Sequence, residues 1–247
     1  MKNGIFATIN IGASAFRMHI TEFRGGTERT LETLIKPLRL GEDTFTHGYI
    51  SLDKVYEGTA VLEKFRQKLD EYNIRNNYRA VCTSGVREAS NRYFFIDHVH
   101  RKTGLNLEII ESTEEIYIKY VGVKSDLAKF EEYEKKGLLL ANVSSGNVSL
   151  SILKNGVSIF SASLPYGSLR LRQLFKFIPI HSRHKAYKQY VQTMFSSMAA
   201  SVDSKIKLKY LVCSGSSVNL LIKIFEPKKN SIKKECFEEL YKKSIGK

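Results

Sequence analysis

Hydrophobic and polar residues alternate along the first forty positions of the chain. The alternation occupies three stretches that small-residue turns separate, at 5–11 (IFATINI), 16–23 (FRMHITEF) and 27–38 (TERTLETLIKPL). A period of two places the apolar side chains on one face of a β-strand. We therefore expect the chain to begin with an antiparallel meander of three strands.

The period then changes to that of an α-helix. Residues 52–73 place Val55, Leu62, Phe65 and Leu69 on one face, and a serine before them is suited to cap the first turn. Further along, the same reasoning predicts strands at 78–83 and 105–110 and helices at 92–104, 113–123 and 126–136. The first half is therefore expected to be an α/β domain.

The second half of the chain repeats this order. It predicts strands at 137–143, 148–153, 157–164 and 208–213, and helices at 167–177, at 182–203 and from Ser216. In both halves a glycine-containing turn joins the first two strands, at Gly12 and at Gly146. We expect an α/β protein of two duplicated domains, 1–124 and 125–247, which pack together and close a cleft around one anion.

The net charge of +14 is unevenly distributed. Residues 1–134 hold 19 Lys and Arg against 20 Asp and Glu, whereas residues 135–247 hold 20 against five. A basic field of this size attracts polyanions such as nucleic acid, polyphosphate or multiply phosphorylated nucleotides. A solvated basic face without a special ligand is the alternative.

The cysteines and the apolar segments indicate where the protein acts. Cys82, Cys213 and Cys236 are widely spaced and fit no disulfide framework or zinc motif, which favours reduced thiols. The amino terminus lacks the apolar core of a secretory signal, and no apolar run approaches the ~20 residues of a membrane helix. We expect a cytoplasmic protein with no membrane partner.

The stretch LLLANVSSGNVSLSIL, residues 138–153, predicts a strand, a tight turn of small residues and a second strand. Such turns let backbone N–H groups approach an anion closely. Nucleotide and polyphosphate chemistry usually adds a carboxylate at the end of the first strand, to hold a metal ion or water. Here that position is Asn142.

Five ordered blocks carry a resemblance to a known family. They are INIGASAFRMHI, LGEDTFTHGYIS, CTSGVREASN, LNLEIIESTEEIYIKYVGV and LPYGSLRLRQLF. Between about Ile5 and Phe225 the chain resembles the exopolyphosphatase and guanosine pentaphosphate phosphohydrolase family (Ppx/GppA). The resemblance implies two ribonuclease-H-like domains of the actin, sugar-kinase and chaperone ATPase superfamily, the second of them truncated. It also implies cleavage of a terminal phosphoanhydride, normally with magnesium, and polyphosphate, pppGpp or ppGpp as partners.

The two phosphate loops depart from the family pattern, which reads Asp-Ile-Gly-Ser-Asn-Ser at the first and Asp-Ile-Gly-Gly-Gly-Ser-Thr-Glu at the second. Asn10 and Asn142 stand at the two aspartates and Ser149 at the glutamate. An amide occupies the space of a carboxylate but has no charge to attract a metal, so we expect no metal site here. The loop positions expected to contact phosphate are Gly12, Ser14, Ser145, Gly146 and Asn147.

Two charged residues of the family pattern remain. Arg87 matches the arginine that clamps phosphate, a role suited to its fork of donors, with a surface or interdomain ion pair as the alternative. Glu115 matches the proposed catalytic base, and Glu114 is the second choice. The segment from Ser112 to Glu115 also forms a capping box, in which Glu115 would accept a hydrogen bond from the N–H of Ser112. Both roles of Glu115 stay open.

Three functions follow from these residues. The first is a protein that binds polyphosphate or a phosphorylated guanosine nucleotide in the interdomain cleft, with hydrolysis impaired or lost and no cofactor. The alternative is an active exopolyphosphatase that uses Glu115 as base, Arg87 as anchor and Mg²⁺ as cofactor. The third is a nucleic-acid-binding protein, for which no RRM, KH, helix-turn-helix or zinc-finger signature is present. The sequence does not predict an oligomeric state.

Overall fold

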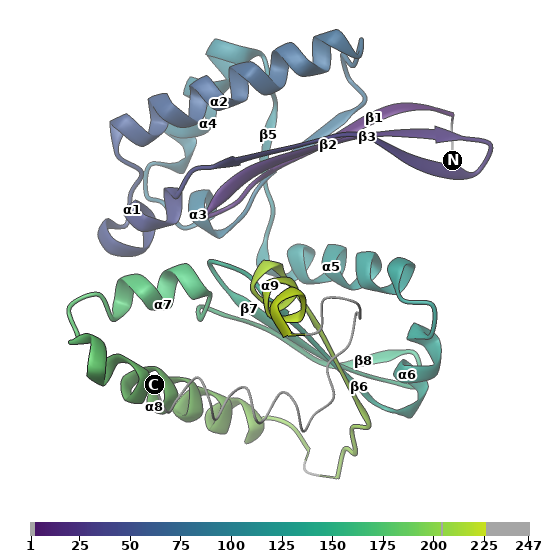
Figure 1. Cartoon of the computed structure of the whole chain (residues 1–247), viewed down its shortest axis with the longest axis vertical. Helices are drawn as coiled ribbons and strands as arrows, with labels where there is room; N and C mark the ends of the chain where they lie inside the picture. The colour runs from purple at the N-terminus through teal and green to yellow at the C-terminus, as the bar shows by residue number, and fades with distance from the viewer. Residues whose placement is uncertain (1–2, 204, 226–247) are drawn as a thin grey trace. The chain divides into compact units, whose positions relative to one another are not determined.

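The computed structural model describes residues 3–203 and 205–225 (Figure 1). The chain divides into two compact units, Met1–Glu115 and Ile116–Lys247. The division falls within helix α5 (Ser112–Asp126), which also contains the domain boundary expected after residue 124.

The first unit is built on a five-stranded sheet with the order β3-β2-β1-β4-β5. Its strands are β1 (Gly4–Ile11), β2 (Ala15–Arg24), β3 (Thr27–Pro37), β4 (Tyr78–Cys82) and β5 (Leu107–Ile109). The first three strands are antiparallel neighbours, which confirms the predicted meander. β4 and β5 run parallel to β1, so the chain returns through helices between them.

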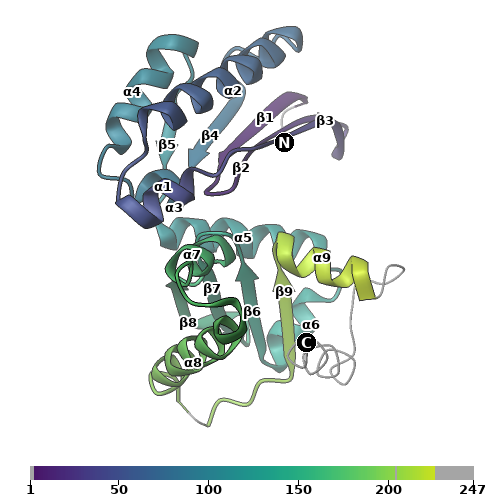
Figure 2. The same cartoon turned by 60° about the vertical axis from the view of Figure 1, so that its left-hand side comes forward.

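Two long helices, α2 (Leu52–Glu71) and α4 (Arg92–Thr103), cover one face of this sheet (Figures 1 and 2). Both were predicted from their apolar period. The side chains of Ile9, Phe16, Phe65 and Phe95 are fully buried between the sheet and these helices. The apolar face of the meander therefore forms one side of a well-packed core.

Two short helices were not predicted, α1 (Leu40–His47) and α3 (Ser84–Arg87). Helices of one or two turns depend on tertiary contacts, because propensity and period are weak over so few residues. Here the buried hydroxyl of Thr44 in α1 donates to the carbonyl of Gly85 in α3, at 2.6 Å. The two helices thus stabilise each other beside the turn that follows β1.

The second unit contains a four-stranded sheet with the order β8-β7-β6-β9. Its strands are β6 (Leu138–Val143), β7 (Val148–Lys154), β8 (Val157–Leu164) and β9 (Tyr210–Ser214). Its helices besides the end of α5 are α6 (Phe130–Lys136), α7 (Ser168–Leu174), α8 (Ile180–Ala199) and α9 (Ser216–Phe225). The predicted strands and helices of this half are all present.

One face of this second sheet packs on the end of α5 and on α6. Phe130, Leu138, Leu140 and Leu153 form its buried cluster. α7 and α8 lie on the other side of the strands (Figure 2). α8 has no buried residue, so its contribution to the core is small.

The first four strands of the first sheet, β3-β2-β1-β4, have the same order and connections as the four strands of the second sheet, β8-β7-β6-β9. In each, three antiparallel strands are followed by a strand that pairs in parallel with the first, β4 with β1 and β9 with β6. This common order confirms the duplicated α/β architecture that the repeated pattern predicted. Among the helices that the structure describes, none is long and apolar enough to cross a membrane.

Candidate phosphate-binding loops

The first loop, residues 12–14, joins β1 to β2. The N–H of Gly12 donates to the carbonyl of Ala15 at 3.1 Å, which closes the turn. The carbonyls of Ala13 and Ser14 accept hydrogen bonds from the N–H groups of Gly41 and Leu38, at 2.9 and 3.2 Å. Because the peptide unit is planar and trans, the N–H of Ser14 points away from the carbonyl of Ala13 and from Gly41.

The first loop is also held by the start of α3. A Cβ atom on Gly85 would lie 2.7 Å from the Cα of Ala13, a distance that real side chains do not reach. Glycine is therefore required at this position of the CTSGVREASN block. The close contact between Gly85 and Ala13 therefore restricts the backbone of the first loop.

Asn10 and Arg17 face each other across the first two strands. They are register partners in the β1–β2 ladder. The Cβ position of Gly12 lies 3.8 Å from Asn10 Oδ1 and 3.7 Å from Arg17 Nη1, so both side chains border the loop. Arg17 was not among the residues expected at the site, although the predicted hairpin pairs it with Asn10. Arg17 places a positive charge opposite Asn10, the position at which the family pattern has an aspartate.

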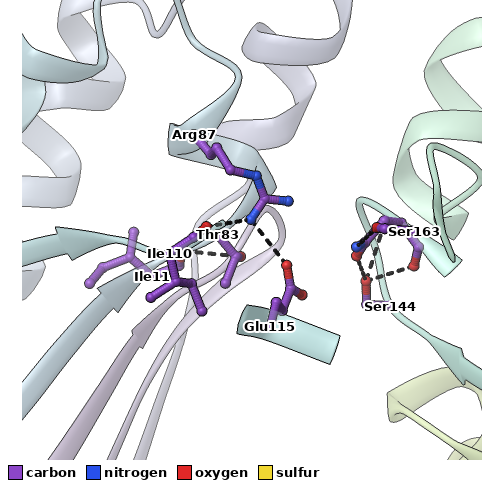
Figure 3. Close-up of polar contacts among 8 residues, drawn as sticks. Ile11, Thr83, Arg87, Ile110, Glu115, Ser144 and Ser163 are labelled. Carbon is purple, nitrogen blue, oxygen red and sulfur yellow. Dashed lines mark hydrogen bonds and ion pairs between the residues drawn. The ribbon is translucent and has the colours of Figure 1, made fainter. Parts of the chain in front are cut away.

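The second loop, residues 144–147, joins β6 to β7 and is closed by its own side chains. The Oγ of Ser144 donates toward Asn147, 2.8 Å from its backbone carbonyl and 2.6 Å from its Oδ1. The Nδ2 of Asn147 donates to the Oγ of Ser163 in β8 at 2.7 Å (Figure 3). The Asn147 side chain is buried. It therefore supports the loop from inside the sheet, although we had expected it to contact phosphate.

The carbonyl groups of Ser144, Ser145 and Gly146 in the second loop face the start of α7. Ser144 and Ser145 accept from the N–H groups of Ser168 and Leu169 at 3.1 and 3.0 Å. The carbonyl of Gly146 accepts from Arg170 Nε at 2.9 Å. The N–H groups of Ser145 and Gly146 belong to the same trans peptides and point the opposite way.

This arrangement leaves backbone donors available to an anion. No acceptor within residues 3–203 and 205–225 takes the N–H of Ser14, Ser145 or Gly146. Successive N–H groups with one orientation form a concave site for a phosphate oxygen. The arrangement also depends on a close approach, because a Cβ on Gly167 would lie 2.3 Å from the carbonyl carbons of Ser145 and Gly146.

Asn142 lies in a row of polar side chains across the second sheet. Its register partners are Ser149 on β7 and Ser214 on β9. Asn142 Nδ2 donates to Ser214 Oγ at 2.8 Å. Its Oδ1 is buried and, in the part of the chain that the structure describes, has no hydrogen-bond partner. A buried acceptor without a donor costs about 1–3 kcal/mol.

The structure brings Arg87 and Glu115 together within the first unit. Arg87 Nη1 donates to Glu115 Oε2 at 3.1 Å and to the carbonyl of Ile110 at 2.8 Å (Figure 3). The side chains of Arg87 and Glu115 are only 10% and 9% exposed. The residues expected as phosphate anchor and catalytic base thus form a largely buried ion pair. It ties α3 to the end of β5 and to the first turn of α5.

The other contacts of this turn separate Glu114 from Glu115. α5 begins at Ser112, and the N–H of Glu115 donates to the carbonyl of Glu111, which places Glu111 at the N-cap position. Glu114 lies on the surface, where it accepts from Arg79 at 2.7 Å. This hydrogen bond and another to Glu108 raise the pKa of Arg79. Glu114 thus serves a surface ion pair.

A magnesium ion is not suited to these donors. Mg²⁺ is usually held by one or two carboxylates together with substrate phosphates. Asn10 and Asn142 supply neutral amides, Ser149 supplies a hydroxyl, and Glu115 is engaged by Arg87. Among the described residues, no three His, Cys, Asp or Glu side chains form a group that could hold a metal ion.

A comparison of the sequence with models of known protein families gives the same family as the resemblance of the loops. The model of the Ppx/GppA phosphatase family matches residues 20–247. The chain belongs to this family. Phosphohydrolases of this family generally depend on a divalent metal ion.

Two curated proteins illustrate the relationship. The chain is 25% identical over 179 residues to a bifunctional 3-dehydroquinate synthase/phosphatase of Fusobacterium nucleatum, which covers 70% of this chain and 26% of that protein. It is 28% identical over 119 residues to a guanosine-5'-triphosphate,3'-diphosphate pyrophosphatase of Vibrio cholerae, which covers 48% and 24%. The chain therefore spans about a quarter of the length of these relatives.

Solved structures support the fold. An exopolyphosphatase from Cytophaga hutchinsonii superposes with a TM-score of 0.83 at 20% identity, over 98% of this chain and 80% of that one. The Aquifex aeolicus family member gives 0.69 at 22% identity, over 93% and 72%. The Ppx/GppA chain thus has the α/β fold of these structures, with one sheet in each of its two units.

Proposed function

We propose that this Ppx/GppA chain binds polyphosphate or a phosphorylated guanosine nucleotide and hydrolyses it very slowly or not at all. Binding is supported by the backbone of the two loops, whose N–H groups of Ser14, Ser145 and Gly146 point away from the helices that hold the loop carbonyls. It is also supported by Arg17 beside the first loop and by the basic second half. Phosphate contacts of this kind need no carboxylate.

The loss of hydrolysis is supported above all by the ion pair between Glu115 and Arg87, which occupies the expected catalytic base. It is also supported by the absence of acids from the two loops. Three positions with acids in the family pattern carry Asn10, Asn142 and Ser149. A positioned base contributes about 10²–10⁴-fold to a rate, and metal and electrostatic stabilisation supply much of the rest in phosphoryl transfer. Glu115 alone would leave turnover very slow.

An active phosphoanhydride hydrolase is the second candidate. It is favoured by the survival of Glu115 in a buried position beside a guanidinium. In that case Glu115 would accept the proton of the attacking water, and Arg87 would hold the phosphate. The two candidates differ in one measurable quantity, the rate of phosphate release.

The test measures phosphate release from polyphosphate and pppGpp with Mg²⁺, together with direct binding of both compounds. We expect binding of at least one compound and no turnover above the blank. The matched control is the variant Asn10→Asp, Asn142→Asp, Ser149→Glu, in which we expect a higher rate that depends on Mg²⁺. Robust wild-type turnover that Glu115→Gln abolishes would make this chain an active enzyme and refute the proposal.

A further inference from the structure

Arg87 and Glu115 are both candidates for the phosphate chemistry, yet they neutralise each other. Arg87 Nη1 donates to the Glu115 carboxylate and to the carbonyl of Ile110, and both charged side chains are nine-tenths buried. A guanidinium has five N–H donors, so this nitrogen does not exhaust its capacity. Its positive charge, however, is already balanced by the Glu115 carboxylate, whose Oε2 lies 3.1 Å from Arg87 Nη1.

We propose that Glu115 is an internal counter-anion of Arg87, and that it lowers the affinity of the first unit for phosphate. This inference rests on the proposed phosphate binding. A phosphate that approaches Arg87 meets a charge already compensated, and it also meets the negative charge of Glu115. Both effects oppose binding, and they are strong because a partly buried pair is screened less than an exposed one. Phosphate has to displace Glu115 or bind beside it.

The neighbouring residue provides a control of equal charge. Glu114 lies one position earlier in the same helical turn and pairs with Arg79, whose side chain is 47% exposed. Removing the charge of Glu114 changes the net charge of the protein by the same amount as removing that of Glu115. The difference between the two variants therefore isolates the contact with Arg87 from the general gain in positive charge.

The experiment measures the binding of sodium tripolyphosphate by calorimetry at one ionic strength, for the wild type, Glu115→Gln and Glu114→Gln. We expect Glu115→Gln to bind about tenfold more tightly than the wild type, and Glu114→Gln to change the affinity by less than about threefold. Replacing Arg87 as well, in Arg87→Gln with Glu115→Gln, should abolish the gain. Glu115→Asp retains the charge on a shorter side chain, so it should give a smaller rise.

Each outcome decides the matter. If the wild type binds but Glu115→Gln binds no more tightly than Glu114→Gln, the counter-anion role is wrong and the proposed function stands. If none of the proteins binds tripolyphosphate, polyphosphate or pppGpp, the proposed function fails and takes this inference with it. If Glu115→Gln does not fold, Glu115→Ala is compared with Glu114→Ala: a gain in affinity no larger than that of Glu114→Ala would overturn the role.

Discussion

A double-mutant cycle on Arg87 and Glu115 measures how much their contact stabilises the first unit. The variants are Glu115→Gln, Arg87→Gln and the two changes together. In Glu115→Gln the amide oxygen can still accept from Arg87, which also keeps the carbonyl of Ile110. We therefore expect a loss of about 1–3 kcal/mol in the free energy of unfolding, below the 3–5 kcal/mol of a fully broken buried pair.

Arg87→Gln should cost more than Glu115→Gln. It removes the guanidinium from a carboxylate whose side chain is 9% exposed, and it removes the donor to the carbonyl of Ile110 at the end of β5. We expect a loss of about 3–5 kcal/mol, and a coupling energy between the two positions of about 1–3 kcal/mol. Hydrogen exchange of the β1 and β4 amides measures these losses, because these strands report on the first unit alone.

The Arg79–Glu114 pair is the internal comparison. Its atoms are closer, at 2.7 Å against 3.1 Å, but its side chains are 47% and 42% exposed. Exposed pairs contribute about 0.2–1 kcal/mol, so we expect the shorter contact to be the weaker one. A coupling energy at Arg87–Glu115 no larger than that at Arg79–Glu114 would refute the argument from burial.

Two further outcomes follow from the loops and the charge distribution. Gly167→Ala should destabilise the second unit by more than about 1–3 kcal/mol, because its Cβ would overlap the second loop, whereas Gly122→Ala on α5 meets open space and should stabilise by about 0.5–1 kcal/mol; equal melting temperatures for the two variants would contradict this. Polyphosphate affinity should fall steeply as salt rises, because residues 135–247 carry 20 basic and five acidic side chains and each neutralised phosphate releases counterions; a flat affinity across salt concentrations would contradict it.

Periodicity was sufficient to predict the sheets and the helices α2 and α4, because each buries an apolar face. The strands of both meanders and the helices α2, α4 and α8 lie where the pattern placed them. The helices α1 and α3 were missed because contacts distant in sequence stabilise them, such as the hydrogen bond from Thr44 to the carbonyl of Gly85. Such contacts leave no local signal.

In the candidate site too, features with a local sequence signal were predicted, and features that depend on contacts distant in sequence were not. The loops were predicted from their small residues, and the missing acids were visible in the sequence. The pairing of Arg87 with Glu115 was not predicted, since 28 residues separate them and three elements have to meet to form it. The position of Arg17 beside the first loop could have been predicted, because the expected hairpin places it opposite Asn10. The direction of the loop N–H groups required the structure.

The buried oxygen of Asn142 leads to a prediction about the lost acid. Asn142→Asp would place a carboxylate in this position, where Ser214 Oγ lies within hydrogen-bond distance of one side-chain atom and the other has no partner among the described residues. We expect the variant to be less stable than the wild type by about 1–3 kcal/mol without metal, because a buried charged acceptor is then unpaired.

Mg²⁺ should reverse this loss, because an ion that binds only the folded state stabilises it by mass action. The measurement is the melting temperature of Asn142→Asp and of the wild type, each with and without Mg²⁺. We expect Mg²⁺ to raise the melting temperature of the variant and to leave that of the wild type unchanged, since the neutral amide provides no charge for the ion. A control with NaCl at the same ionic strength separates site binding from general screening. An equal response of the two proteins to Mg²⁺ would show that the second loop no longer has the geometry of a metal site, and that restoring its acids cannot restore hydrolysis.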